Sequence, residues 1–396
     1  MPTTPLPGAA RDRAGRSGDH GDDVRRWFVL VVLCVSLLVV AVDATVLHVA
    51  VPAVSERLRP DGVELLWIVD AYPLVCASLL ILFGTLGDRV GRRRVLLAGY
   101  ACFGVASGVY DIVLVVGAEK MRDVTPRESL VGQLAETGHP VHGKGVTAPG
   151  MFALFATRYF DCFGIGRETL AKVAMKNHRH GSLNPKAHFQ KEITLEQYLK
   201  APMVADPLGL YDCCPHTDGA AAAVICRADL VSRFGQEPIL VKGLGLANPV
   251  GDTLAFDPES DFISFRATKE AAQQAYDQAG IKDPFKEIDV AEVHDCFTIT
   301  ELVTYEDLGF CRKGEGPQFI DKGVSSLDGE LPVNPSGGLK SCGHPIGASG
   351  LRMIAEITNQ LRGRAGRRQV KDAKQGLVHN LGGLGAVTSV IVLANS

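Results

Sequence analysis

The sequence lacks an excess of positive charge. Its 396 residues include 41 Lys and Arg against 44 Asp and Glu, which gives a formal net charge of −3. Proteins that bind nucleic acids usually carry a basic surplus or a basic stripe, so this balance argues against a nucleic-acid partner. The length is sufficient for two or three domains with a large buried core.

The cysteines also lack a recognisable pattern. None forms a C-x-x-C pair, and their spacing matches neither a zinc knuckle nor the disulfide framework of a small secreted domain. We therefore expect no metal site, a reducing compartment, and mostly small, buried, reduced thiols. The ten are Cys34, Cys76, Cys102, Cys162, Cys213, Cys214, Cys226, Cys296, Cys311 and Cys342.

Long apolar runs are confined to the first hundred residues. Residues 1–26 are polar and are predicted to form a disordered cytoplasmic tail. The runs at 27–51 and 66–86 are each long enough to cross a bilayer, which takes a helix of about 20 residues. A secretory signal peptide is the alternative for the first run, although its apolar part would be shorter.

Arginines before the first run and after the second predict that both ends lie in the cytoplasm. Asp43, inside the first run, either faces a protein interior or snorkels toward a helix end. AVDATVLHVAVPAV and the loop Gly84–Arg94 resemble the start of a major facilitator superfamily drug:proton antiporter, over about 20–106. Two helices and part of a third cannot form a transport path, so transport by this chain is not expected.

The remaining residues alternate between strand and helix patterns, which predicts an α/β fold with layered sheets. In the predicted helix, Thr268 is the expected N-cap, and Gly280 lies just past the end. Strands are predicted at 112–116, 218–226, 238–247, 288–293 and 376–394, and helices at 268–280, 298–310 and 350–362.

Three stretches carry residues suited to chemistry. His294 and Cys296 stand two residues apart where a strand closes, so both can face one side; a structural His and a buried Cys are the alternative. His344 lies in a Gly/Pro turn, with Gly343 and Gly347, before a helix whose N-terminus could polarise a carbonyl or hold an anion. A surface His in an ordinary turn is the alternative there.

The third stretch, HNLGG, holds His379 and Gly382 in a predicted terminal turn that permits close backbone approach. A phosphate-binding loop is the rival, but neither a Walker pattern nor a G-x-G-x-x-G that opens a helix is present. With EKM at 119–121, KNH at 176–178 and CCPHTDGAAAAV at 213–224, the three stretches resemble the thiolase superfamily over about 107–395. HDCF at 294–297 resembles the sterol-carrier-protein branch.

The resemblance implies a truncated thiolase fold, layered αβαβα, with two transmembrane helices before it. It also implies a coenzyme A thioester as substrate, no cofactor, and a homodimer as in the parent family. His344 would activate the nucleophile and help form an oxyanion hole. His294 would serve a second oxyanion site through water, and Cys296 would be the acid/base at the acyl α-carbon. Gly343, Gly347, His379 and Gly382 would support the turns.

That chemistry requires an enolate stabilised by electrostatics and a proton acceptor with a pKa near the working pH. Acyl transfer also requires a nucleophilic thiolate, which thiolases carry in a loop of their first half. Counting back from Gly108 places this loop near Gly91, where no cysteine stands; Cys76 is too distant, and Cys102 lies in a helix-like run. No nucleophile is found.

We therefore expect residues 107–396 to be a thiolase-like acyl-CoA C-acyltransferase domain of lipid metabolism that lacks most of its N-terminal half. The parent reaction would be of the acetyl-CoA acetyltransferase or 3-ketoacyl-CoA thiolase type, and this chain is expected to be inactive. The domain is expected in the cytoplasm, attached to a membrane if residues 27–106 insert. Two alternatives remain, a fragment of a membrane transporter and a non-catalytic acyl-CoA-binding subunit.

Overall fold

The computed structural model describes residues 105–123, 125, 147–234, 237–249, 260–383 and 385–395. The predicted membrane spans lie outside these residues, and so does the stretch that resembles a transporter up to residue 104. Within the described ranges, no helix is both long and apolar enough to cross a membrane. The α/β class predicted for the rest of the chain is confirmed.

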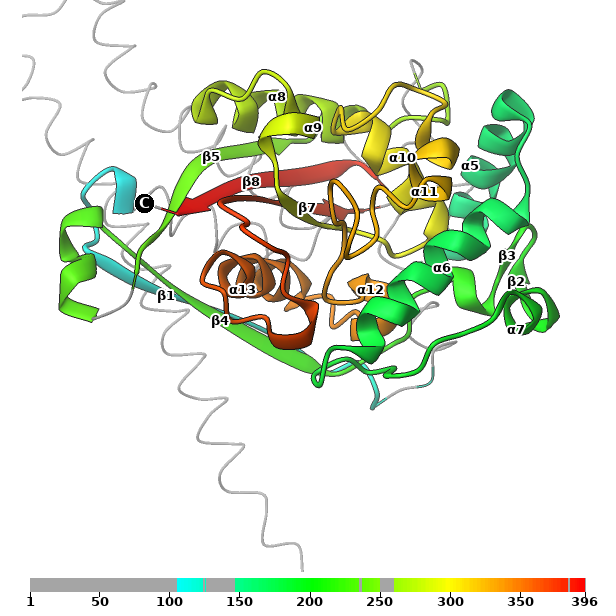
Figure 1. The fold of residues 1–396 in the computed structure, drawn as a ribbon, viewed down its shortest axis with the longest axis horizontal. Coiled ribbons are helices and arrows are strands. Elements are labelled where there is room, and N and C mark those ends of the chain that lie inside the picture. The colour runs from blue at the N-terminus through cyan, green and yellow to red at the C-terminus, as the bar shows by residue number, and fades with distance from the viewer. Residues whose placement is uncertain are drawn as a thin grey trace, which may run out of the picture. The chain divides into compact units, whose positions relative to one another are not determined.

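A four-stranded sheet forms the centre of the described structure (Figure 1). Its strand order is β5 (Ile239–Ala247), β8 (Val387–Asn395), β7 (Gln375–Gly382) and β6 (Val290–Val293). Strands β6 and β7 run parallel, whereas β7–β8 and β5–β8 are antiparallel. Strands β6, β7 and β8 are buried along most of their length, as expected for a sheet covered on both faces.

Helix α8 (Arg266–Ala279) covers one face of this sheet, where it packs on β5 and β8. Alanines on its inner side allow a close approach, and β5 places a glycine there. A Cβ built on Gly245 would lie 1.8 Å from the carbonyl oxygen of Ala271. The glycine in β5 is therefore a packing requirement of the helix–sheet contact.

Helix α13 (Ser349–Leu361) packs on the opposite face and separates the sheet from a second one. This second sheet is the antiparallel pair β1 (Ile112–Glu119) and β4 (Gly219–Cys226). Val115 of β1 packs against Leu351 of α13. The described residues thus form four layers in the order helix, sheet, helix, sheet (Figure 1).

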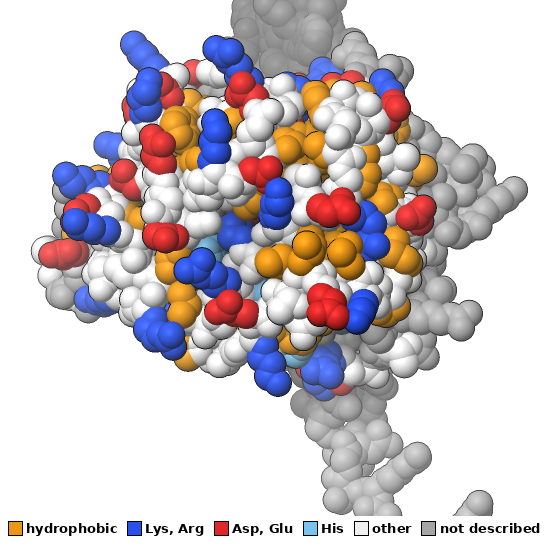
Figure 2. Space-filling view, turned by 45° about the vertical axis from the view of Figure 1, so that its right-hand side comes forward, with side chains coloured by type: hydrophobic (Ala, Val, Ile, Leu, Met, Phe, Trp, Pro, Cys, Tyr) orange, Lys and Arg blue, Asp and Glu red, His pale blue; other side chains and the backbone are white. Residues whose placement is uncertain are grey.

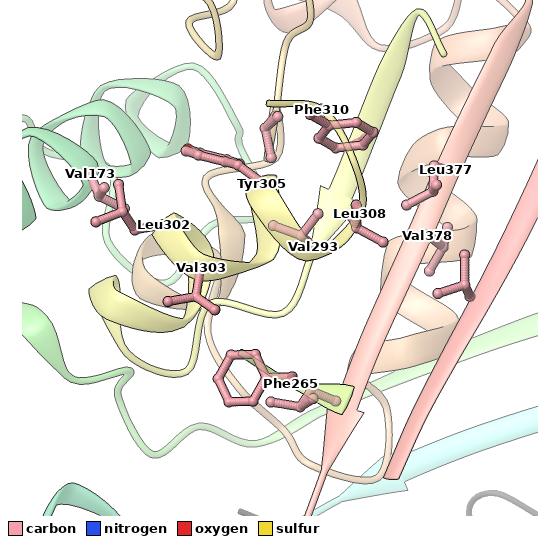
Figure 3. Packing of buried hydrophobic residues seen from close by; sticks show 14 of the residues in the cluster. Val173, Phe265, Val293, Leu302, Val303, Tyr305, Leu308, Phe310, Leu377 and Val378 are labelled. Carbon is pink, nitrogen blue, oxygen red and sulfur yellow. The ribbon is translucent and has the colours of Figure 1, made fainter. Parts of the chain in front are cut away.

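Helix α10 (Thr298–Asp307) crosses the core, and all ten of its residues are buried. It packs on α6 (Arg167–Ser182) and α5 (Ala148–Phe163); Figure 3 shows Leu302 of α10 against Val173 of α6.

The smaller elements are α7 (Leu195–Lys200), β2 (Met203–Ala205), β3 (Leu208–Gly209), η2 (Leu210–Asp212), η3 (Ala228–Phe234), α9 (Pro284–Glu287), α11 (Gly316–Asp321), α12 (Gly338–Cys342) and η5 (Gly366–Arg368).

Two predicted elements differ from the structure. Helix α8 begins at Arg266 after Phe265, so Thr268 is not its N-cap: this residue lies inside the helix and its hydroxyl faces His379. Gly280 ends the helix in the left-handed conformation, as predicted. The predicted single strand at 376–394 is a hairpin, because the glycines that follow β7 turn the chain back into β8.

Candidate active site

The segment from His294 to Phe297 leaves the carboxyl end of β6 and is fixed there by Asp295. This fully buried carboxylate accepts hydrogen bonds from Asn177 Nδ2 (2.8 Å), Leu339 N (2.6 Å) and Lys340 N (3.3 Å). Burial raises the pKa of Asp295 to about 6. Asp295 thereby joins helix α6, the start of α12 and the end of β6 behind the candidate site.

A buried cation lies next to this segment. Lys340 is 1% exposed, and its ammonium donates to the carbonyl oxygens of Asp212 and, at 3.0 Å, Cys296. On the other side, the carboxylate of Glu301 accepts from Asn177 Nδ2 at 2.6 Å and from the Lys176 ammonium. Two residues of the predicted KNH stretch, Lys176 and Asn177, therefore hold the segment through buried polar contacts.

His294 is held by Asn380, the neighbour of His379 on β7. Nδ1 of His294 lies 3.0 Å from Asn380 Oδ1. An amide oxygen can only accept, so Nδ1 carries the proton and Nε2 keeps a free lone pair. Burial lowers the pKa of His294 to about 4, so the ring is neutral at pH 7. Nε2 can then accept a hydrogen bond from a water, as the predicted water-mediated role requires.

His344 lies beside His294: the ring centroids are 5.1 Å apart and the planes nearly perpendicular. Its Nδ1 is 2.8 Å from Ser349 Oγ, and that hydroxyl donates to the carbonyl of Pro345 at 3.0 Å. Because Ser349 has one proton to give, Nδ1 of His344 must be the donor and Nε2 the acceptor. Burial lowers the pKa of His344 well below its usual value. A neutral imidazole with a free Nε2 suits a general base.

One backbone N–H of the glycine-rich turn, where the sequence predicts an anion site, already has an acceptor within the chain. The N–H of Gly347 donates to the carboxylate of Glu119 at 3.0 Å. Gly343 adopts φ 108°, and a Cβ there would meet the side chain of Thr217 at 2.8 Å. A Cβ on Gly117 would likewise lie 2.3 Å from the Gly347 oxygen. The turn is packed tightly against β1 and the segment before β4.

His379 lies in strand β7 rather than in a terminal turn, and it is completely buried. The backbone N–H of His294 points to its Nδ1 at 3.4 Å, so Nε2 carries the proton and donates to Thr268 Oγ1 at 3.0 Å. Burial lowers the pKa of His379 to about 3. His379 is therefore placed to position the His294 backbone, and Gly382 pairs with Val387 where β7 ends.

Cys296 is 8% exposed, and its sulfur lies 3.7 Å from the Thr300 hydroxyl. Burial raises the pKa of Cys296 to about 12, although Thr300 and Lys340 act in the opposite direction. The sequence predicts that Cys296 is a proton acceptor with a pKa near neutrality. In this structure, the raised pKa of the buried thiol differs from that prediction. The resting thiol is protonated and can donate a proton to a carbanion.

Sequence patterns do not mark Lys340 or Asn380, although Asn380 directly follows a predicted site histidine. His216 is a further omission: its charge would contribute to lowering the pKa of His344, after burial and the neighbouring His294 and Arg352. Figure 2 shows histidine as small surface areas next to Lys and Arg side chains. In the part of the chain described, no three His, Cys, Asp or Glu side chains are grouped as metal ligands.

Family models match most of the described chain. "Thiolase, N-terminal domain" matches residues 99–229, and "Thiolase C-terminal domain-like" matches residues 250–395. An acetyl-CoA acetyltransferase of Methanothermobacter thermautotrophicus is 42% identical over 290 residues, which cover 73% of this chain and 74% of the relative.

Sterol carrier protein 2 of Oryctolagus cuniculus is 37% identical over 294 residues, or 70% of this chain. The chain spans only about half, 52%, of the length of that relative. Among solved structures, a protein described as "Ltp2-ChsH2(DUF35) aldolase" superposes with a TM-score of 0.64 at 28% identity, over 76% of this chain and 78% of that one.

Proposed function

Since the chain belongs to the thiolase family, we propose that its site binds an acyl-CoA thioester and carries out proton transfer at the acyl α-carbon. The observation that carries the proposal is the contact between two neutral imidazoles, His294 and His344. Cys296 follows His294 by two residues, and the Lys340 ammonium donates to its backbone carbonyl. Enolate chemistry needs a polarised thioester oxygen and a proton donor or acceptor. A water held by Nε2 of His294 would donate to that oxygen, while Nε2 of His344 would accept a proton and the Cys296 thiol would donate one. The relative named an acetyl-CoA acetyltransferase supports this substrate class.

We infer that the chain as written does not transfer acyl groups, because no described cysteine is suited to be the nucleophile. The thiolate is the attacking species, so a nucleophile needs a depressed pKa. Burial instead raises the pKa of five of the seven described cysteines; the other two, Cys162 and Cys226, lie on helix α5 and strand β4. Those with raised values are Cys213, Cys214, Cys296, Cys311 and Cys342.

The test uses the full chain with acetoacetyl-CoA and coenzyme A. We expect no thiolysis and no acyl-enzyme in an intact-mass spectrum, but measurable binding of acetoacetyl-CoA by calorimetry. Replacing residues 1–106 with the first part of the Methanothermobacter relative should restore thiolysis, which Cys296→Ala and His344→Ala should then abolish. Cys226→Ala, on strand β4, is the matched control. Turnover by the unaltered chain would refute the missing nucleophile, and absence of binding would refute the substrate class.

Aldol-type cleavage is a second candidate. It is favoured by the similar structure described as an aldolase and by the lack of an activated cysteine among the described residues. Retro-aldol cleavage of a β-hydroxyacyl thioester breaks the Cα–Cβ bond, gives a carbonyl product and leaves an enolate that takes up a proton. No acyl-enzyme is required. Release of a ketone or aldehyde from a β-hydroxyacyl-CoA, without thiolysis of acetoacetyl-CoA, would select this candidate.

We also propose that residues 27–51 and 66–86 attach the chain to a membrane and leave the thiolase-type domain on the cytoplasmic side, as the flanking arginines suggest. The family models begin at residue 99 and do not cover these runs. Retention of the full chain in carbonate-washed membranes tests this placement. Recovery in the supernatant would contradict it.

We propose further that the chain forms a homodimer, as in the parent family. Sedimentation of the full chain tests this proposal.

A further inference from the structure

Cys213 and Cys214 lie alongside the segment that carries Cys296. Cys213 faces Phe297 in an isolated antiparallel bridge, and the Cys214 N–H donates to the Cys296 carbonyl at 2.9 Å. This pattern makes Cys214 the residue opposite Cys296. Opposite residues of an antiparallel pair project to the same side, and their Cα atoms are about 5.5 Å apart at hydrogen-bonded positions.

The two neighbouring cysteines are not equivalent. Successive side chains along an extended segment point to opposite sides, so Cys213 points away from Cys296 when Cys214 points toward it. The sulfur of Cys213 lies 3.5 Å from the Gly209 carbonyl, on the other side. Burial raises the pKa of Cys214, and the charge of a Cys296 thiolate would raise it further, an influence that Cys213 does not share.

We propose that Cys214 and Cys296 form an oxidisable pair, a modification site at which hydrogen peroxide converts two thiols into a disulfide. A Cα separation of about 5.5 Å lies within the range that disulfides span, so the backbone need not move far. Both thiols are free in the structure, and Cys214 is the more exposed of the two.

The chemistry balances in two steps. Peroxide oxidises the Cys214 thiol to a sulfenic acid and releases one water; the reaction passes through the small thiolate fraction, so the raised pKa of the buried Cys214 thiol makes this step slow. The Cys296 sulfur then attacks the Cys214 sulfur, the S–O bond breaks, and the hydroxyl leaves with the second thiol proton as another water. Two electrons pass from the cysteines to each peroxide.

The consequence for chemistry, which rests on the proposed function, is loss of the proton at Cys296. An oxidised chain has no acid/base thiol, so α-carbon proton transfer stops until a thiol reductant restores it. Formation of the disulfide itself does not depend on acyl-CoA binding. The two ideas can therefore fail separately.

The test treats the reduced full chain with hydrogen peroxide, blocks remaining thiols with N-ethylmaleimide, and identifies cross-linked peptides by mass spectrometry. We expect a cross-link between the peptides that contain Cys214 and Cys296, reversed by dithiothreitol. It should fall to background in Cys214→Ser and in Cys296→Ser. It should persist in Cys213→Ser, the matched neighbour.

Loss of the cross-link in Cys213→Ser together with its retention in Cys214→Ser would overturn the pairing. So would oxidation of Cys296 to a sulfinic acid while Cys214 remains a free thiol. Circular dichroism of each serine variant establishes that it folds like the parent chain. Binding of acetoacetyl-CoA by the reduced chain is measured in parallel, so that failure of the disulfide is distinguished from failure of the substrate class.

Discussion

At the scale of single residues, the site depends on histidines that stay neutral. His379 accepts from the His294 backbone, and His294 and His344 each keep an unprotonated Nε2. Burial is the first cause of the lowered pKa in all three. Burial of the rings therefore contributes more to keeping the three imidazoles neutral than the charge of any neighbouring residue does.

His379→Gln tests the neutral state of the most buried of these rings. The folded pKa of His379 is lowered to about 3, whereas the unfolded value is near 6.5. Between pH 6.5 and pH 3, His379 binds a proton in the unfolded chain but not in the folded chain. The stability of the folded chain that is present above pH 6.5 is therefore lost as the pH falls toward 3. We expect the stability difference between parent and variant to shrink by about 1.4 kcal/mol per pH unit below pH 6.

Urea unfolding at pH 8, 6 and 5 measures this difference. His188→Gln, at a histidine that is exposed in the folded chain, is the matched control for loss of an imidazole. A constant difference between parent and His379→Gln from pH 8 to pH 5 would show that His379 takes up its proton in the folded state.

Asp295→Ala tests the anchor behind the site. The change leaves one amide of Asn177 and two backbone N–H groups without their acceptor in a fully buried location. Buried donors that lose their acceptor cost about 1–3 kcal/mol each, so we expect the free energy of unfolding to fall by at least 3 kcal/mol. Asp161→Ala, at an exposed ion pair on α5, should change it by less than about 0.5 kcal/mol. If urea titrations gave the same loss of unfolding free energy for Asp295→Ala and Asp161→Ala, Asp295 would not be the anchor of the site.

At the scale of helices and strands, the sequence predicts several elements well but none between residues 116 and 218, where the structure has helices α5 and α6. Strands at 112–116, 218–226 and 238–247 and the helix at 350–362 coincide with β1, β4, β5 and α13 within a few residues. Apolar runs bounded by glycine or charged residues identify such elements, because burial of a local run of apolar side chains determines where these strands and helices form. The predicted N-cap of α8 is wrong because the Thr268 hydroxyl forms a hydrogen bond with His379, which lies far away in the sequence, so no local pattern indicates this contact.

The candidate site follows the same division. The motifs identify His294 and His344, which the structure brings together. Several side chains that hold the site come from distant segments: Asn380 on β7, Lys340 on α12 and Glu119 on β1. Such contacts depend on the tertiary arrangement, which periodicity and spacing do not specify.

Gly245→Ala tests the contact between α8 and the central sheet. The new methyl group would lie 1.8 Å from the backbone oxygen of Ala271, so helix and strand must separate. Overpacking of this kind costs about 1–3 kcal/mol, and a backbone clash places the expected loss at the upper end. Gly150→Ala, in helix α5 with its nearest neighbour at 3.4 Å, should instead stabilise by about 0.5–1 kcal/mol. Thermal unfolding distinguishes the two, and similar shifts would contradict the packing argument.

At the scale of the whole molecule, the described layers end on an apolar sheet face. The inner side of the β1–β4 pair packs on α13, but the outer side carries Ile112 (47% exposed), Leu114 (64%), Val116 (53%) and Val224 (60%). In the described part of the chain, β1 and β4 pair only with each other. Open strand edges beside an exposed apolar face promote association between chains.

We therefore expect residues 107–396, produced alone, to be poorly soluble, and Leu114→Lys with Val224→Glu to correct this. These two residues stand directly opposite each other in the sheet, so the new charges attract across the strands and disfavour stacking of apolar faces. Light scattering should show large aggregates for the parent fragment and a much smaller species for the double variant. Leu199→Lys, at one of the two exposed leucines of α7, is the control and should leave the aggregation unchanged. Equal aggregation of all three proteins would place the association outside the β1–β4 face, and a soluble parent fragment with a sharp, cooperative melt would contradict the expectation itself.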